Sequence, residues 1–291
     1  MPPKRKAVKQ AAGKAAAKER PAQKARTENE EQDPPPAPAA VPSSGAGAIL
    51  PEENPQADAA ASELNKTKKM IANIKKLHDP NDEEGVETAL EELDEYGPFN
   101  DDCHDEPDWA ETFANAIGAG IFPGALVAMT NFPESKGIVE LSIRILVSMT
   151  YEPPDVKYLR ILVDLDAIGT VLRGMMKLQD KANIIATGCR FLFNSIIHLK
   201  ESAVAQVNEF DASIELFIQV LELHKDEAGV QVDACSLINR LIDEDKDNKY
   251  DMRSKLKKAK AMSKVVQAME IHAEHPDVQE QGKAAMEALL G

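Results

Sequence analysis

The sequence predicts an all-α fold over residues 63–291, built from tandem helical repeats. A pattern of apolar residues recurs there, with 46, 46 and 48 residues between equivalent positions. Within each copy the apolar residues return every three or four positions, which is the period of an amphipathic helix. Residues 64–291 contain no strand-type alternation and no glycine-rich nucleotide loop. The equivalent positions, used below as the anchor of each copy, are Ile138, Ile184, Val230 and Val278.

Residues 1–62 predict a disordered tail, because they contain very few large aliphatic residues. Residues 1–26 hold nine Lys and Arg against one acid, a net charge of +8, and Lys4, Arg5 and Lys6 resemble a nuclear import signal. The following Lys-Gln-Ala-Ala-Gly-Lys stretch is similar to linker-histone tails. A solvated arm without a receptor and an organelle transit peptide are the alternatives.

The rest of the chain is acidic: residues 27–291 hold 25 basic and 48 acidic residues, a net charge of −23. This balance argues against a nucleic-acid groove along the helical part, so nucleic acid is expected to contact only the tail, and weakly. Seven prolines in residues 34–55 predict an extended spacer, with a PxxP-type ligand as the alternative.

Each copy predicts two amphipathic helices joined by a short polar connection. Nine residues before the anchor stand Met129, Met175, Leu221 and Met269. Four residues after it stand the small residues Ser142, Gly188, Ala234 and Gly282. Eight residues after it stand Leu146, Leu192, Ile238 and Met286. A small residue one turn before a large one predicts close packing between helices.

A third, shorter helix is predicted before the pair from the second copy onward, at residues 156–163, 203–210 and 250–260. Asp155 and Ser202 are the expected N-caps of the first two of these helices. A fainter copy lies upstream, with Val86 as its anchor, and residues 108–119 predict the first helix of the copy that follows it. The sum is about five repeats, the first a two-helix cap.

A three-helix unit of this length, whose last helix reads Val278-Gln-Glu-Gln-Gly-Lys-Ala-Ala-Met-Glu-Ala-Leu-Leu, resembles an armadillo repeat. The resemblance covers residues 64–291 and implies a right-handed α-solenoid of about five armadillo-like repeats. It also implies that a partner peptide or domain binds along a concave groove lined by the third helices. Many unrelated functions share this fold, so the resemblance does not name a partner.

In the importin-type branch of the family, Trp six residues and Asn ten residues after the anchor line the groove. Here the sixth position holds Arg144, Arg190, Ser236 and Ala284, and the tenth holds Ser148, Asn194, Arg240 and Ala288. Only Asn194 matches, which argues against recognition of basic import signals. Because arginine binds carboxylates and phosphates through paired donors, Arg144, Arg190, Asn194 and Arg240 predict a groove for an acidic or phosphorylated peptide. Solvated arginines paired with acids such as Asp233 and Glu140 are the alternative.

Two further groups of polar residues are predicted to be solvated or structural. A basic helix on the convex side could meet an acidic partner or nucleic acid, but it lacks interleaved aromatic residues, which favours a solvated face. Its residues are Lys255, Lys257, Lys258, Lys260 and Lys264. His78, His224 and His272 fall at equivalent helix ends, where histidine favours the local dipole.

Three patterns resemble chemical sites without completing them. Residues 243–248 begin like a calcium loop but lack its turn glycine and its final glutamate. Cys103 and His104 supply two adjacent zinc ligands where four are required. Cys189 and Cys235 occupy the same repeat position and predict packed small residues. We therefore expect no metal, no cofactor, no small-molecule substrate and no enzymatic activity.

The compartment prediction is nuclear, cytoplasmic or both. The three cysteines show no CxxC spacing, the N-terminus has no apolar leader, and no apolar run reaches the length of a membrane span. The function predicted first is a non-catalytic scaffold or adaptor for a protein partner. A cofactor of Hsp70-type chaperones that promotes nucleotide exchange, and a chromatin-associated protein whose histone-like tail contacts DNA, are the alternatives. The sequence does not identify the partner, the pathway or the oligomeric state.

Overall fold

The computed structural model describes residues 55–96 and 109–291, and within these ranges the protein is all-α: helices and their connecting turns are present and strands are not. These residues belong to one unit, Glu53–Gly291. The helices in chain order are α1 (Pro55–Lys76), α2 (Glu83–Tyr96), α3 (Trp109–Ala119), α4 (Ile121–Asn131), α5 (Lys136–Tyr151), η2 (Val156–Leu159), α6 (Arg160–Asp164), α7 (Ala167–Lys177), α8 (Ala182–Leu199), α9 (Glu201–Glu209), α10 (Ser213–Leu223), α11 (Ala228–Glu244), η3 (Lys246–Asn248), α12 (Met252–Lys258), α13 (Ala261–Ile271) and α14 (Pro276–Leu290).

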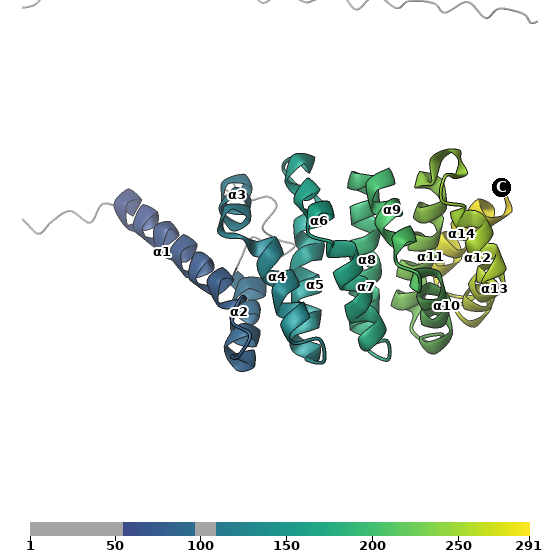
Figure 1. Ribbon diagram of the computed structural model, residues 1–291, viewed down its shortest axis with the longest axis horizontal. Coiled ribbons are helices and arrows are strands. Elements are labelled where there is room, and N and C mark those ends of the chain that lie inside the picture. The colour runs from purple at the N-terminus through teal and green to yellow at the C-terminus, as the bar shows by residue number, and fades with distance from the viewer. Residues whose placement is uncertain (1–54, 97–108) are drawn as a thin grey trace, which may run out of the picture. The chain divides into compact units, whose positions relative to one another are not determined.

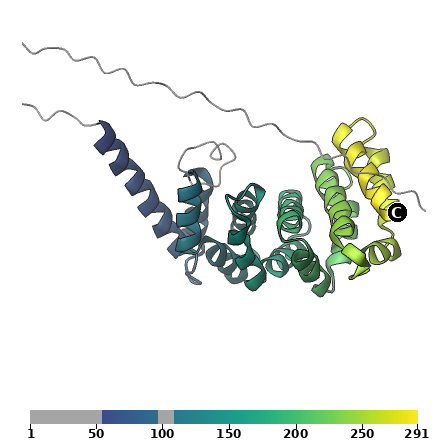
Figure 2. The same cartoon turned by 90° about the horizontal axis from the view of Figure 1, so that it is seen from above.

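Five longer helices pack against one another in chain order. α2 contacts α5, α5 contacts α8, α8 contacts α11, and α11 contacts α14 (Figure 1). We call these the long-helix row. The helices α4, α7, α10 and α13, each of 11 residues, pack against the long helix that follows them in the chain. Figure 2 shows the same order of helices from a second direction. The helices α3, α6, α9 and α12 come before these pairs.

The predicted helix pairs are confirmed at all four anchors, and the anchors themselves are buried. The structure also explains the small residue four positions after the anchor. A Cβ atom on Gly188 would lie 2.5 Å from the Met175 sulfur, and one on Gly282 would lie 2.5 Å from Met269 Cγ. The methionine nine positions before each of these anchors therefore fills the space that the missing side chain leaves.

The predicted N-caps have different outcomes. Asp155 is the N-cap of η2, and its carboxylate accepts a hydrogen bond from the backbone N–H of Lys157 at 2.8 Å. The prediction for Ser202 is wrong, because α9 begins one residue earlier, at Glu201, and the capping position is Lys200 with a φ of 50°. The turn after α8 is so short that the chain enters α9 before Ser202 is reached.

The first helix begins earlier than the predicted boundary between a tail at 1–62 and a helical domain at 63–291. α1 starts at Pro55. Proline is well suited to the first turn of a helix, where its missing N–H would be unpaired in any case, and the alanine-rich residues after it favour helix. The proline that suggested a spacer thus stands at a helix start.

No single helix in the described ranges is long and apolar enough to cross a membrane. α3 and α4 together meet the criterion of length and composition, but the pair is bent by 52° at the break between them.

Candidate functional site

The four residues predicted to line a groove lie on three neighbouring members of the long-helix row. Arg144 is on α5, Arg190 and Asn194 are on α8, and Arg240 is on α11. The three arginine side chains are 50%, 58% and 31% exposed, whereas Asn194 is only 8% exposed. The structure therefore brings these residues onto adjacent helices but gives them different surroundings.

Arg144 and Arg190 are each held by a carboxylate of a neighbouring helix. Arg144 Nη2 lies 2.7 Å from Asp94 Oδ2 on α2. Arg190 Nε donates to both carboxylate oxygens of Asp233 on α11, at 3.1 and 3.0 Å. The two carboxylates are mostly covered, with exposed fractions of 15% and 12%. The pair of Arg190 with Asp233 is one that the sequence predicts as the alternative to a free groove arginine.

Asp233 is a carboxyl group on this row whose pKa is raised. Burial raises its pKa above the ordinary value, while the hydrogen bond and the charge of Arg190 act in the opposite direction. Removing Arg190 would therefore leave a covered carboxylate with little compensation.

Arg240 is held differently from the other two arginines. Its closest carboxylate is Glu244, one turn along α11, and Arg240 Nη1 lies 3.8 Å from Glu244 Oε1, beyond hydrogen-bond distance. Arg240 Nε and Glu244 Oε2 are both covered and make no hydrogen bond to a described residue. The guanidinium carbon instead lies over the ring of Phe193 on α8, 5.4 Å from the ring centre. Arg240 is thus oriented by an aromatic ring rather than by a hydrogen-bonded acid.

Asn194 lies one turn after Arg190 on α8 and directly after Phe193. Although it is 8% exposed, its side-chain amide makes no hydrogen bond to any residue in 62–95 or 109–291. Neither amide atom is fully covered, so both can still reach solvent or a ligand. Free hydrogen-bonding groups on an otherwise buried residue make Asn194 the strongest candidate for a ligand contact on the long-helix row.

Polar side chains also connect successive long helices. Asn183 of α8 donates to Glu140 of α5 at 3.4 Å, and Ser236 of α11 donates to Gln281 of α14 at 3.0 Å. Glu140, which the sequence suggests as an arginine partner, is also 4.0 Å from Lys136 on its own helix. The partners in the cross-helix contacts are 43 and 45 residues apart, close to the repeat spacing. That spacing is the signal by which the sequence could have revealed these pairs.

The helix-end histidines are structural. The Nε2 atom of His224 lies 2.7 Å from the carbonyl oxygen of Gln179, and that of His272 lies 2.8 Å from the carbonyl oxygen of Lys225. A carbonyl only accepts, so Nε2 carries the proton in each ring. Each histidine thus joins the end of one 11-residue helix to the turn after the preceding one. The position is as predicted, but the partner is a backbone carbonyl rather than the local dipole alone.

Sequence reasoning missed two glutamines that cap the ends of 11-residue helices. Gln231 is fully buried and donates to the carbonyl oxygens of Leu221 and His224, at 3.3 and 2.7 Å. Gln279 makes the same two contacts with Met269 and His272. Both stand one residue after an anchor, where the first two copies have apolar residues. This substitution within the repeat was the available signal.

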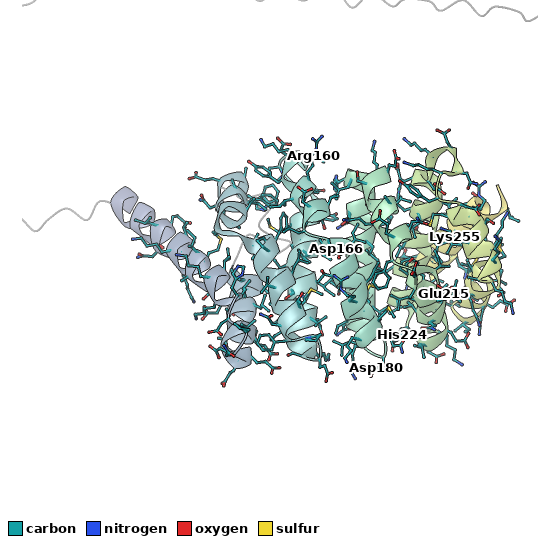
Figure 3. The ribbon with its side chains drawn as sticks, in the orientation of Figure 1. Arg160, Asp166, Asp180, Glu215, His224 and Lys255 are labelled. Atoms are coloured by element: carbon teal, nitrogen blue, oxygen red, sulfur yellow. The ribbon has the colours of Figure 1, made fainter. Side chains whose placement is uncertain are left out.

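The predicted basic helix is partly neutralised. Lys255 on α12 bonds to the side-chain oxygen of Asn208, and Lys264 on α13 bonds to Glu222. Lys257, Lys258 and Lys260 are exposed. A cavity of about 450 Å³ lies between α9, α10 and α12. Its lining carries both signs of charge, including Lys255 and Glu215, which Figure 3 labels. The mixed lining does not select a ligand of either sign.

The two cysteines in the described residues and the calcium-like segment have structural roles. Burial raises the pKa of the Cys235 thiol to about 12, and burial also raises that of Cys189, so both are packed residues as predicted. Asp245, in the calcium-like segment, accepts hydrogen bonds at 2.9 Å from the backbone N–H groups of Tyr250 and Met252. Across 55–96 and 109–291 no group of three or more His, Cys, Asp or Glu could hold a metal ion.

Several predicted features lie outside the described residues. They are the import-like Lys4, Arg5 and Lys6, the histone-like stretch, nearly all of the predicted tail and proline-rich spacer, and the adjacent Cys103 and His104.

No protein-family model and no curated protein matches the sequence. Among solved structures, the chain is similar to a crystal structure of an engineered protein, with 13% sequence identity and a TM-score of 0.49. The match covers 76% of this chain and 96% of the other. A similarity at this level gives no information about function.

Proposed function

We propose that the unit is a right-handed α-solenoid of about five armadillo-like repeats, acting as a non-catalytic scaffold that binds a protein partner along its long-helix row. The cross-helix contacts support a tandem arrangement. Many polar contacts join residues 42–48 apart, as in the pairs Lys177–Glu134, Lys249–Glu201 and Gln206–Val163. Contacts restricted to neighbouring copies are the mark of a repeat architecture.

The observation that carries the proposal is the amide of Asn194, which makes no hydrogen bond to a described residue although Asn194 is only 8% exposed. An amide presents one acceptor and two donors, so it can pair with both the N–H and the C=O of an extended peptide. A bound peptide would supply the hydrogen bonds that no described residue provides. Asn194 is therefore proposed to contact the main chain of the partner.

The surroundings of Asn194 suit a peptide better than a small molecule. Phe193 and Ile197 on α8 and Val147 on α5 are partly exposed apolar side chains on the C-terminal halves of their helices. Partly exposed apolar residues beside unsatisfied polar groups are typical of the centre of a protein interface. Arg240, on the neighbouring helix α11, adds charged donors.

Selection from a library of random displayed peptides tests this function. The full chain should enrich a family of related peptides, and Asn194→Ala should enrich none of them or bind them at least about tenfold more weakly. Asn131→Ala is the matched control, because Asn131 is an exposed asparagine at the end of α4. Equal binding by the wild type and Asn194→Ala, or no enrichment by the wild type, would sink the proposal.

A further inference from the structure

We infer that the partner segment carries one anionic side chain, a carboxylate or a phosphate, which is recognised by Arg240 together with Asn194, and that Arg144 and Arg190 do not take part in reading it. The inference rests on the proposed peptide-binding function. Of the three candidate arginines, it leaves one that binds the anion, at a position between α8 and α11.

Two of the three arginines are already paired with a carboxylate of this chain. Arg144 has Asp94 at 2.7 Å, and Arg190 forms two hydrogen bonds to Asp233. Moving either arginine to a ligand would take a paired cation away from a mostly covered carboxylate. Such a move is unfavourable, so these two pairs are structural.

Arg240 has no comparably close carboxylate partner. None of its guanidinium N–H groups makes a hydrogen bond to a described residue, and its contact with Glu244 is 3.8 Å long. A guanidinium group is normally satisfied by several acceptors. The contact with Phe193 orients the group without using its donors, because the guanidinium carbon lies over the ring. The Nη donors of Arg240 are therefore the ones open to a ligand, since Nε is covered.

The second donor is Asn194. Phe193, over which the Arg240 guanidinium lies, is the residue before Asn194, so the arginine of α11 already reaches across to α8 at this point. Arg240 and Asn194 also occupy the same position, ten residues after the anchor, on two helices that pack together. An anion bound here would accept from the guanidinium and from the amide N–H, as oxyanions do at sites with several fixed donors.

Glu244 is the internal competitor of the ligand. Its Oε1 atom is the nearest acid to Arg240, and its Oε2 atom is covered and makes no hydrogen bond within the described ranges. A carboxylate so close reduces the attraction of Arg240 for a second anion. Neutralising Glu244 should therefore strengthen binding of an anionic ligand, whereas it would not strengthen binding of a neutral one.

The test uses peptides selected by the full-length wild-type chain and then made synthetically. We expect the enriched family to share one Asp or Glu, and replacement of that acid by its amide to weaken binding to the wild type about tenfold or more. Arg240→Gln should remove this difference between acid and amide peptides. Arg190→Gln, a matched change of an arginine on the same row, should keep it, and Glu244→Gln should increase affinity for the acid peptide. A peptide with phosphoserine at the same position then shows whether the site prefers a carboxylate or a phosphate, because the peptide with the preferred anion binds more tightly.

The inference is overturned if the enriched peptides share no acid, or if Arg190→Gln abolishes the preference while Arg240→Gln preserves it. Weaker binding of the acid peptide to Glu244→Gln would also overturn it. In each of these cases the proposed peptide-binding function stands, because peptides were enriched. If the wild type enriches no peptides at all, the proposed function itself fails.

Discussion

The internal helix pair α7–α8 and the C-terminal pair α13–α14 share one residue pattern but differ in burial. Leu192 and Ile196 on α8 are fully buried, whereas their counterparts Met286 and Leu290 on α14 are half-buried and 69% exposed. The reason is the number of neighbours. α8 packs against both α5 and α11, but of the long helices in the described ranges only α11 contacts α14. The comparison teaches that the burial of a repeat position depends on the next helix as much as on its own residue.

The polar positions differ in the same way. Arg190 of α8 and Asp233 of α11 form a charged pair, and at the equivalent positions one step along, Ser236 of α11 and Gln281 of α14 form a neutral one. Both contacts join successive long helices. The charged contact couples stability to pH, and the neutral contact does not.

The largest predicted difference is between two equivalent apolar positions. Leu192→Ala removes a fully buried side chain and should lower the free energy of unfolding by about 2–5 kcal/mol. Met286→Ala should cost about 1 kcal/mol, because its side chain already reaches solvent. Urea unfolding followed by circular dichroism measures both. Equal losses would show that α14 is covered as completely as α8 and would break the comparison.

A second difference concerns the two glycines that face methionines. Gly188→Ala should destabilise by about 1–3 kcal/mol, since the new Cβ overlaps Met175, which is buried and has little room to move. Gly282→Ala should cost less, because Met269 is only half-buried and can shift. Gly229→Ala is the control: a Cβ there meets nothing within 4 Å and should be neutral or stabilising by up to about 1 kcal/mol. Thermal unfolding midpoints rank the three variants. A lower midpoint for Gly282→Ala than for Gly188→Ala would contradict this account.

The smallest effect is the pH dependence of the charged pair. The pKa of Asp233 is raised by burial, so the folded state binds its proton more tightly than the unfolded state, and stability falls as pH rises from the ordinary carboxyl pKa through the raised one. Arg190→Ala should raise that pKa further and cost up to about 1 kcal/mol near pH 7. The loss should shrink at pH values where Asp233 is protonated.

Three comparisons check this prediction. The cost of Arg190→Ala should disappear in an Asp233→Asn background, which a double-mutant cycle measures. Ser236→Ala, at the neutral pair, should show a cost that does not change with pH. A cost of Arg190→Ala that grows on acidification would mean that the sign assigned to Asp233 is reversed.

Much of the fold was accessible from the sequence, because helical periodicity is a local property of the chain. Positions as different as Met175 and Gly188 could be assigned to facing helices before any coordinates, since a small residue and a flexible large one recur together. Helix ends were less accessible. Ser202 was expected to cap α9, but the cap depends on the backbone of the turn before it, where Lys200 adopts a positive φ. Side-chain type does not report that conformation.

The features of the candidate site were likewise only partly predictable from the sequence. The sequence by itself determined that arginine and asparagine recur six and ten residues after the anchors, that two amphipathic helices form around each anchor, and that Cys189 and Cys235 are packed. Only the tertiary structure decided that Arg190 is bound to Asp233, that Arg240 lies over Phe193 without a hydrogen bond to a described residue, and that the amide of the mostly buried Asn194 makes none either. The physical reason is that repeat spacing places side chains on the same face of successive helices, while the rotation and separation of those helices choose which pairs come within a few ångströms.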